Sequence, residues 1–329
     1  MAAARTAFVT GGSGFIGGAL IRRLVADGWD VRGLARSDAA AGKVADAGAD
    51  AVRGDLGDPA AIKDGAEGCE HAFHAAASLA QWGPWEEFVR INLDGTGHAL
   101  AGCREAGVRR FVHVGTEAAL IAGQPLVNVD ETAPLRPDSK AHYPASKAMA
   151  EQAVRAANGD GFETVVVRPR FVWGPGDQTL LPGMLEMVER GRFAWVGGGR
   201  HLTSTTHVDN TVEGLVLAGE RGRGGEAYFV TDGEPVVFRD MVSDLLRTRG
   251  VEPPTRNVPA PVARAGAAIC EALWKALPLK GPPPLSRFPI WISSLECTIN
   301  ISKARSELGY EPIVSIEEGL RQMRQGAGD

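Results

Sequence analysis

A glycine-rich turn near the N-terminus constrains the fold of this chain more strongly than any other feature. The segment VTGGSGFIGG places Gly11, Gly14 and Gly17 between a short apolar run, residues 6–10, and a helix-like run that stops at Gly28. Glycines at this spacing keep side chains out of the turn, so that backbone N–H groups and a helix N-terminus can face a pyrophosphate. A purely structural turn would also use glycines, but the position between a first strand and a first helix favours dinucleotide binding. The neighbours predicted to contact the cofactor from the same turn are Ser13, Phe15 and Ile16.

Strand-like and helix-like segments alternate through the first half of the chain. Apolar runs are separated by helical patterns, the longest of which extends from about Trp85 to Ala106. Strands separated by helices need parallel crossover connections, which predicts an α/β fold with a doubly wound, parallel Rossmann sheet. The predicted strands are residues 6–10, 30–35, 49–55, 71–77, 109–115 and 163–169.

The pattern changes after Pro169. The pieces WGPGD, VGGGR, ERGRGGE and LKGPPPL break the second half into short, irregular segments. We predict a dinucleotide-binding Rossmann domain over residues 1–168 and a smaller, irregular α/β substrate-binding region over residues 169–329. A segment at about residues 204–219 is expected to return to the Rossmann domain.

Charge and cysteine content narrow the class of protein. The net charge is −5, with 35 Lys and Arg against 40 Asp and Glu, and no long basic block is present. This balance argues against nucleic-acid binding. The four cysteines, at positions 69, 103, 270 and 297, are far apart and lack a C-x-x-C spacing, so we expect neither a disulfide framework nor a metal site. Free thiols fit a reducing compartment, and we predict a cytoplasmic protein.

The sequence predicts neither a signal peptide nor a membrane-spanning segment. The first apolar run is short, and no uninterrupted apolar stretch reaches about 18 residues. The strongest candidate for peripheral membrane contact is the segment 262–279, which carries Arg264, Glu271 and Lys275. Such a segment can only lie on a membrane surface or pack on the fold, and ordinary helix packing is the favoured interpretation.

The residue after the second predicted strand indicates which cofactor is used. An acidic residue there would accept a hydrogen bond from the 2′-hydroxyl of NAD, whereas an arginine would pair with the 2′-phosphate of NADP. This chain has Ala35 followed by Arg36, which favours NADP(H). Arg36 could instead be a solvated loop residue, and Asp38 could bind the ribose after a small loop shift, which leaves NAD(H) as the alternative. After the third strand, Asp55 and Leu56 are placed to reach the adenine, unless Asp55 only completes a turn.

Tyr143 and Lys147 form the predicted catalytic pair. They lie four residues apart on a helix with Pro144 in its first turn, so they share one helix face. A phenol normally ionises near pH 10, and a neighbouring ammonium together with an oxidised nicotinamide would lower its pKa; a shift of about three units needs about 4 kcal/mol. Tyr143 could then take a proton from an alcohol or return one to a carbonyl. The spacing also occurs by chance, and the pair could simply lie on a helix surface.

A hydroxyl at the end of the fifth predicted strand makes this pair more specific. Residues at the carboxyl ends of such strands line the ligand crevice, and Thr116 occupies that position in FVHVGTEAA. Its hydroxyl could bind the substrate oxygen and stabilise the developing charge. A turn or a helix cap would use the same residue.

These residues together resemble the extended short-chain dehydrogenase/reductase family, within the NAD-dependent epimerase/dehydratase superfamily. The resemblance runs through nearly the whole chain and rests on TGGSGFIG, GDL, HAAA, NLDGT, VGTEA, YPASK, RPRFVWGPGD, HVDN and ELGYEP. It implies that Thr116, Tyr143 and Lys147 are the catalytic trio and that Lys147 also binds the nicotinamide ribose. It implies that Asn92, near the cofactor, stabilises the sheet or joins a proton relay. The other positions that the family places along the cofactor are His74, Ala75, Ala76, Pro169 and Arg170.

Departures from the family pattern bear on the substrate. Sugar-nucleotide dehydratases carry an Asp-Glu pair after the threonine, whereas this chain has Glu117 and Ala118. Many sugar-nucleotide members have Asn and Tyr where this chain has Phe171 and Trp173. These changes imply a more apolar pocket, and the chain is most similar to the 3β-hydroxysteroid dehydrogenase branch. The expected pocket residues are Trp82, Glu117, Phe171 and Trp173, with Trp85, Trp195 and Trp291 as candidates that could equally be core residues.

The favoured function is that of an NAD(P)(H)-dependent oxidoreductase that interconverts a secondary alcohol and a ketone on a bulky apolar substrate. A 3β-hydroxysteroid-like molecule and a 3-hydroxy/3-keto acyl compound both fit this description. One alternative is a sugar-nucleotide epimerase that retains its NAD. Another, of a different class, is a non-catalytic NADP(H)-sensing binding protein. The family resemblance also implies a homodimer.

Overall fold

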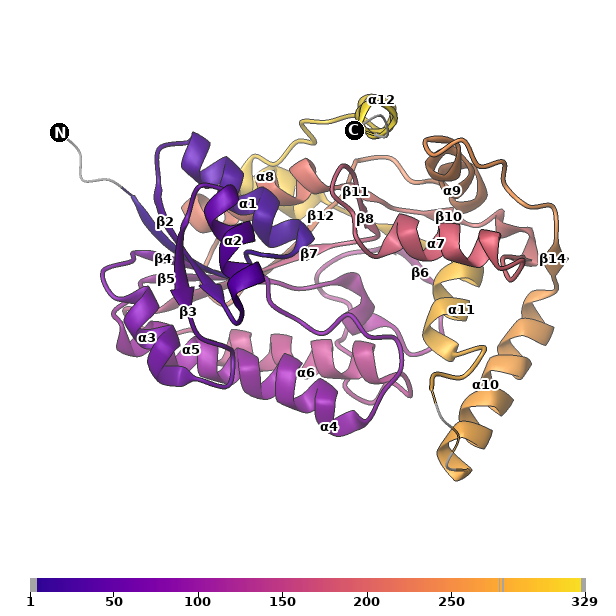
Figure 1. The fold of residues 1–329 in the computed structure, drawn as a ribbon, viewed down its shortest axis with the longest axis horizontal. Helices are drawn as coiled ribbons and strands as arrows, with labels where there is room; N and C mark the ends of the chain where they lie inside the picture. Colours follow the sequence, from indigo (N-terminus) through magenta and orange to yellow (C-terminus); the bar gives the residue numbers. More distant parts are fainter. Residues whose placement is uncertain (1–4, 278, 280, 327–329) are drawn as a thin grey trace.

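Seven parallel strands form the central sheet, in the order β12-β7-β5-β4-β1-β2-β3. The computed structural model describes residues 5–277, 279 and 281–326. Helices cover both faces of the sheet (Figure 1), which confirms the predicted doubly wound α/β class. The strands are β1 (Thr6–Thr10), β2 (Asp30–Ala35), β3 (Asp50–Arg53), β4 (His71–His74), β5 (Arg110–Val114), β7 (Glu163–Pro169) and β12 (Ala227–Val230).

Two helical layers enclose this sheet. One layer holds α1 (Phe15–Ala26), α2 (Asp38–Asp46) and α8 (Val208–Arg221), and the other holds α3 (Pro59–Ala66), α5 (Gly95–Glu105) and α6 (His142–Ala156) (Figure 1). Nearly every residue of the central strands β1, β5 and β7 is buried, as expected for strands covered on both faces, whereas the edge strand β3 is largely exposed. Leu20 and Leu24 of α1 are fully buried, and each such side chain contributes about 1.5–3 kcal/mol by leaving water.

The edge strand β12 was not among the predicted strands. It follows β11 (Thr206–His207) and α8, and it pairs in parallel with β7. The return of the chain to the Rossmann layers therefore extends beyond the expected residues 204–219. The run AYFV directly follows the glycine-rich segment ERGRGGE, whose composition is typical of a loop. The strand was not predicted because the run after this segment is only four residues long.

The long helix predicted from about Trp85 to Ala106 consists of three helical segments. α4 (Trp85–Phe88) leads into a π-helical turn, Val89–Asp94, which continues as α5. π-helical turns insert an extra residue into a helix and occur frequently at functional sites. This turn holds Asn92, one of the predicted cofactor-site residues, in a buried position.

The second half of the chain begins directly after the carboxyl end of β7. A four-stranded sheet has the order β13-β10-β15-β6, and helices α7 and α9 share an apolar cluster beside it. Helix α10 protrudes from the body of the molecule, and α11 packs between it and the core (Figure 1). The strand β6 (Leu126–Val129) comes from the first half of the chain and joins this sheet by pairing with β15. The elements of the second half are β8 (Val172–Trp173), α7 (Leu180–Glu189), β9 (Trp195–Val196), β10 (Leu202–Thr203), β13 (Val236–Val237), α9 (Phe238–Arg247), β14 (Asn257–Val258), α10 (Ala260–Ala276), α11 (Arg287–Ser294), β15 (Cys297–Ile299) and α12 (Ile316–Gln325), in addition to β11, α8 and β12.

Helix α10 covers most of the segment that was considered for membrane contact. Within the described ranges, no helix is both long enough and apolar enough to cross a membrane. Ala263 and Ala267 are buried, in agreement with ordinary packing, whereas Val262, Ile269 and Leu273 are exposed. Packing therefore accounts for only one face of α10.

Candidate active site

The glycine-rich turn, residues 11–17, lies at the carboxyl end of β1 and leads directly into α1; we call it the glycine cradle. Gly14 is the N-cap of α1 and no side chain caps the helix, so the N–H groups of the first turn are open to a ligand. Gly11 has a φ of +75°, and a Cβ there would lie 2.6 Å from the backbone nitrogen of Ala76. A Cβ at Gly17 would collide with the carbonyl of Gly11. This side-chain-free cradle fits a pyrophosphate. The half-buried members of the turn are Ser13, Phe15 and Ile16.

The residues expected to read the adenosine lie at the ends of β2 and β3. Arg36 directly follows β2 and is exposed. Asp38 lies in the first turn of α2 and pairs with Arg53 at 3.1 Å, so binding a ribose through Asp38 would require that pair to open. Asp55 is exposed and its Oδ1 accepts a hydrogen bond from the Gly57 N–H at 2.7 Å, which is the turn-forming role considered above. Leu56, half-buried, lies beside it.

The ring of His74 forms its hydrogen bonds within the protein. Its Nδ1 lies 2.7 Å from the hydroxyl of Thr10 and its Nε2 lies 3.0 Å from the hydroxyl of Thr96. Burial lowers the pKa of His74 to about 3, so the ring is neutral. Only the backbone of this position is left to contact a cofactor, together with Ala75 and Ala76, which follow β4 next to the glycine cradle.

Asn92 connects the loop after β4 to helix α6. Its Oδ1 accepts from the Ser78 N–H at 2.7 Å, and its Nδ2 donates to the hydroxyl of Ser146 at 2.9 Å. Both groups of the amide are therefore engaged within the protein. This arrangement supports the stabilising role that was one of the two considered for Asn92.

Thr116, Tyr143 and Lys147 come together at the carboxyl end of β5. Thr116 follows β5 and caps a short 3₁₀ turn, Glu117–Leu120, which packs against α6. Tyr143, in the first turn of α6, is half-buried, and its ring lies 5.3 Å from that of Phe288 on α11. Lys147 is buried, and its Nζ donates to the carbonyl of Val114 at 2.9 Å.

Burial dominates the electrostatics of Tyr143 and Lys147 in the protein alone. Burial raises the pKa of Tyr143 well above its ordinary value, the charge of Glu117 raises it further, and a hydrogen bond with Thr116 acts in the opposite direction. Burial lowers the pKa of Lys147 to about 8, against a smaller opposing effect of Glu151. The Lys147 ammonium donates to the carbonyl of Val114, and its Nζ lies 3.3 Å from Nε2 of His113.

Glu117 and Arg170 form a buried ion pair behind Thr116, which the sequence analysis did not predict. Arg170 was expected beside the nicotinamide, and Glu117 was expected in the substrate pocket. In the structure, the guanidinium of Arg170 donates a hydrogen bond to the carboxylate of Glu117. The guanidinium also donates to Thr203 Oγ1 at 3.0 Å. The available signal was the presence of charged residues inside two otherwise apolar runs, Glu117 in VGTEAAL and two arginines in RPRFVW, since fully buried charges are nearly always paired. Pro169, also buried, ends β7 next to this pair.

The aromatic residues predicted to line a pocket differ in how deeply their side chains are buried. Trp173 is fully buried, and its Nε1 donates to Asp232 at 2.8 Å, as a core residue would. Phe171 is half-buried and packs against Phe238 in the same region. Trp82 is half-buried in the loop between β4 and α4. The further candidates Trp195 and Trp291 are buried, whereas Trp85 is half-buried.

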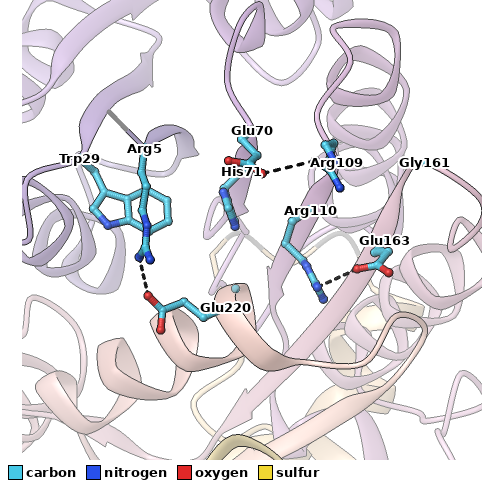
Figure 2. Close-up of a pocket in the computed structure, with 10 residues that line it drawn as sticks. Arg5, Trp29, Glu70, His71, Arg109, Arg110, Gly161, Glu163 and Glu220 are labelled. Carbon is cyan, nitrogen blue, oxygen red and sulfur yellow. Dashed lines mark hydrogen bonds and ion pairs between the residues drawn. The ribbon is translucent and has the colours of Figure 1, made fainter. Parts of the chain in front are cut away.

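A separate hollow of about 430 Å³ lies at the opposite, amino end of the strands (Figure 2). Its walls alternate cations with carboxylates, and the ion pairs Arg5–Glu220 and Arg110–Glu163 span 2.6 Å and 2.7 Å. Ligands of doubly wound sheets bind at the carboxyl ends of the strands. The hollow is therefore not the candidate active site.

Neither metal ligands nor disulfides mark a further site in the described part of the chain. No group of three or more His, Cys, Asp or Glu residues there could hold a metal ion. Cys69, Cys103, Cys270 and Cys297 are free thiols.

Comparison with known proteins identifies the family. The sequence model of the 3-beta hydroxysteroid dehydrogenase/isomerase family matches residues 8–260. The chain belongs to this family. The match confirms the predicted resemblance to extended short-chain dehydrogenases and to the 3β-hydroxysteroid dehydrogenase branch in particular.

Two curated relatives and one solved structure define the similarity further. The chain is 48% identical to the 4-hydroxy-2-methyl-3-oxo-4-farnesyl-3,4-dihydroquinoline-1-oxide ketoreductase of Stigmatella aurantiaca, over 97% of this chain and 95% of that one. It is 39% identical to the 2-alkyl-3-oxoalkanoate reductase of Stenotrophomonas maltophilia, over 96% and 97%. The crystal structure of gox2253 has a TM-score of 0.78 at 28% identity, over 97% and 98%. The predicted oxidoreductase class is confirmed.

Proposed function

We propose that this enzyme reduces a ketone on a bulky, apolar substrate, and oxidises the matching secondary alcohol in reverse, with a nicotinamide dinucleotide in the glycine cradle. The observation that carries the proposal is that Tyr143, Lys147 and Thr116 meet at the carboxyl end of β5, while the cradle lies at the carboxyl end of β1. Only β4 separates β1 from β5, so the glycine cradle and the Tyr143 site are about 10 Å apart across the sheet. An extended dinucleotide bridges such a distance.

A 3-oxo compound with a long apolar chain is the substrate class that we favour. The names of the two relatives above both combine a 3-oxo group with an alkyl or farnesyl chain. Phe288 places an apolar ring directly on Tyr143, which suits such a molecule better than a charged sugar nucleotide. A 3β-hydroxysteroid or its ketone is the second class to be tested.

The protein's own residues would perform the proton transfer. When bound, the reduced dinucleotide supplies a hydride for the carbonyl carbon. Tyr143 donates its phenolic proton to the carbonyl oxygen, so that an alcohol leaves and the phenolate regains a proton from solvent. We assign Lys147, one helical turn away on the same face of α6, to binding the nicotinamide ribose and to stabilising that phenolate.

A turnover screen with reduced nicotinamide tests this proposal against the alternatives. We expect consumption of cofactor with long-chain 3-oxo acids or aryl ketones, and the reverse reaction with the matching alcohols. Isomerisation of a nucleotide sugar without net redox change would instead indicate an epimerase with retained NAD. Tight cofactor binding without turnover of any member of the panel would indicate a binding protein.

NADP(H) is the cofactor that we favour over NAD(H). Arg36 is exposed directly after β2, where a 2′-phosphate would lie, and Asp38 is already engaged by Arg53. We expect kcat/KM with NADPH to exceed that with NADH at least tenfold. Equal values for the two cofactors would remove Arg36 from cofactor selection.

A homodimer and a cytoplasmic location are proposals of a more general kind. The homodimer is supported by the family resemblance, and light scattering on the purified protein gives the mass directly.

The cytoplasmic location is supported by the four free thiols. Fractionation of cells that produce the protein tests it.

We also propose that the outer face of α10 contacts an anionic membrane surface. Val262 and Ile269 are 61% and 60% exposed, and with Leu273 they lie on one side of the helix because their spacings are seven and four residues. The cations Arg264 and Lys275 are exposed, whereas Glu271, the only acid of α10 and α11, is buried and paired with Arg287. An apolar stripe flanked by uncompensated cations suits anionic lipid.

This contact would bring apolar substrates to the site, because α11 packs on α10 and carries Phe288 against Tyr143. We expect the protein to sediment with phosphatidylglycerol vesicles and not with phosphatidylcholine vesicles. The double variant Ile269→Glu/Leu273→Glu should lose this binding, whereas Ile313→Glu, at another exposed position, should keep it. Equal binding of all three proteins, or their self-association through α10, would contradict the proposal.

A further inference from the structure

Helix α11 carries two large aromatic side chains on one face, and both contact the part of the molecule that holds the catalytic residues. Phe288 and Trp291 are three residues apart, which places them on the same side of the helix, and both are buried. The ring of Phe288 lies 5.3 Å from the ring of Tyr143, the separation of aromatic rings in contact. Trp291 lies against Gly123, where an added Cβ would be 3.2 Å from the indole. Helix α11 is therefore docked directly on the site.

A carboxylate from α10 caps the N-terminus of α11. Ser286 is the N-cap residue, but its side chain forms no capping hydrogen bond. Instead, Glu271 Oε1 accepts a hydrogen bond from the Arg287 N–H at 2.6 Å, and Glu271 Oε2 binds the guanidinium of the same arginine. A negative charge in this position satisfies a donor that the helix leaves open, and it faces the positive end of the helix dipole. Glu271 thus takes the place of the missing Ser286 cap.

The capping carboxylate is itself buried, with 4% of its side chain exposed. A buried carboxylate is costly unless it is paired, so Glu271 stays with Arg287 and holds the first turn of α11 on α10. Phe288 directly follows Arg287 in this turn. The contact that fixes the first amide of α11 therefore also fixes the position of the ring that touches Tyr143.

Phe288 determines which chemical groups can lie beside Tyr143 when a ketone binds. A carbonyl oxygen that accepts the phenolic proton lies about 2.7 Å from the phenol oxygen. The carbon skeleton next to this carbonyl then shares the surroundings of Tyr143 with the Phe288 ring. A phenyl ring forms no ordinary hydrogen bonds, so sugar hydroxyls would lose their bonds to water here without replacement. An alkyl chain gains instead, because its carbon leaves water.

We propose that Phe288 is a specificity-determining residue that selects an apolar chain beside the reacting carbonyl, and that Glu271 is the positioning residue that holds Phe288 against Tyr143. The proposal rests on the proposed function and deepens it, because it assigns the choice of substrate to α11. Loss of either side chain should weaken the discrimination between long and short chains without removing the proton donor.

Binding of two ketones to the protein with NADP⁺ tests the proposal without turnover, because the oxidised cofactor has no hydride to give. The probes are ethyl 3-oxodecanoate and ethyl 3-oxobutanoate, which differ only in the length of the alkyl chain, and calorimetry gives the Kd of each. We expect Phe288→Ala to raise the Kd of the long ester by about tenfold or more and that of the short ester by about threefold or less, since the loss follows the apolar area in contact. An unchanged ratio of the two Kd values, or no binding of either ester by the parent, would overturn the proposal.

Two variants of the same helix separate this role from a general loosening of α11. Phe288→Leu keeps an apolar side chain and should retain most of the preference for the long ester. Ile290→Ala removes a buried side chain that packs with Ala263 and Ala267 of α10, and it should leave the ratio of the two Kd values in place. A change of equal size in Ile290→Ala would overturn the assignment of Phe288.

The role of Glu271 is tested by restoring its hydrogen bond without its charge. Glu271→Ala removes the cap and should raise the Kd of the long ester towards the value in Phe288→Ala, while the affinity for NADP⁺ stays close to that of the parent. Glu271→Gln keeps an oxygen that can accept from the Arg287 N–H and should recover part of this loss. Glu226→Gln breaks an ion pair with Lys303 in another part of the molecule and should change neither affinity. Parent-like binding in Glu271→Ala, or an equal loss in Glu226→Gln, would show that Glu271 does not position Phe288.

Turnover with NADPH distinguishes the failure of this inference from the failure of the proposed function. In the active enzyme, Phe288→Ala and Glu271→Ala should raise KM for the long ester and change kcat much less, because Tyr143 remains. If the parent binds the esters but reduces no ketone, the proposed function fails while the Kd values still decide the role of Phe288. If the parent reduces them and Phe288→Ala keeps the same preference for the long ester, only the inference about α11 is lost.

Discussion

The two ends of the parallel strands carry similar charged side chains in different surroundings. We call the side of the sheet where the strands begin the amino edge and the side where they end the carboxyl edge. At the amino edge, the Arg5–Glu220 pair is 57% and 30% exposed, and the neighbouring pairs reach into the same open hollow (Figure 2). At the carboxyl edge, the Glu117–Arg170 pair is buried behind the catalytic residues. The carboxyl edge also receives the open N-terminus of α1, whose N–H groups and dipole favour an anion. The two edges therefore differ in the direction of the strands and in the burial of their charged groups, and not in the types of residue that they carry. These two differences make the carboxyl edge suitable for chemistry and leave the amino edge solvated.

The largest effect should come from Tyr143→Phe at the carboxyl edge. Removing the hydroxyl leaves the ring and its contact with Phe288 but removes the proton donor. We expect kcat for ketone reduction to fall by about 10²–10⁴-fold. Calorimetric binding of NADPH should stay within a few-fold of the parent. Retained turnover would show that Tyr143 is not the proton donor and would argue against an active site at the carboxyl edge.

Gly17→Ala should weaken cofactor binding at the carboxyl ends of the same strands. The added Cβ would collide with the carbonyl of Gly11 and force the glycine cradle open. We expect the affinity for NADPH, measured by calorimetry, to fall by about tenfold or more, since the cradle depends on close backbone approach. Gly97→Ala on α5 is the matched control, because its Cβ would meet no atom within 4 Å. Similar affinities in both variants would mean that a dinucleotide binds elsewhere.

Arg36→Ala should change cofactor preference without changing the chemistry. Loss of a charge-assisted hydrogen bond costs about 1.5–3 kcal/mol, which corresponds to about tenfold or more in KM for NADPH. KM for NADH should hardly change, because NADH lacks the 2′-phosphate. Steady-state kinetics with both cofactors measure this, and a parallel rise in the two KM values would indicate general damage to the loop.

The smallest effect should come from Glu220→Gln at the amino edge. This substitution breaks an exposed ion pair, and such pairs contribute about 0.2–1 kcal/mol. We expect the free energy of unfolding, from urea titration, to change by no more than this, with unaltered kcat and KM. A large loss of activity would show that the two edges are coupled and would break the comparison.

The chain's local patterns determined most of the fold and part of the site. The glycine spacing, the strand–helix alternation and the Tyr143–Lys147 spacing predicted the Rossmann sheet and the catalytic helix, because each is a short-range pattern with a short-range cause. The strand β12 escaped prediction because its partner β7 lies about sixty residues away, and the glycine-rich segment before it resembles a loop.

Only the tertiary structure decided the electrostatics of the site. From sequence, Lys147 together with an oxidised nicotinamide was expected to lower the pKa of Tyr143; in the protein alone, burial and the charge of Glu117 raise it. Glu117 and Arg170 are more than fifty residues apart, and no local pattern pairs them. The sequence by itself determined which groups could react and which strands would carry them. Folding decided which charges lie together out of water, where the lower dielectric strengthens their effect on one another.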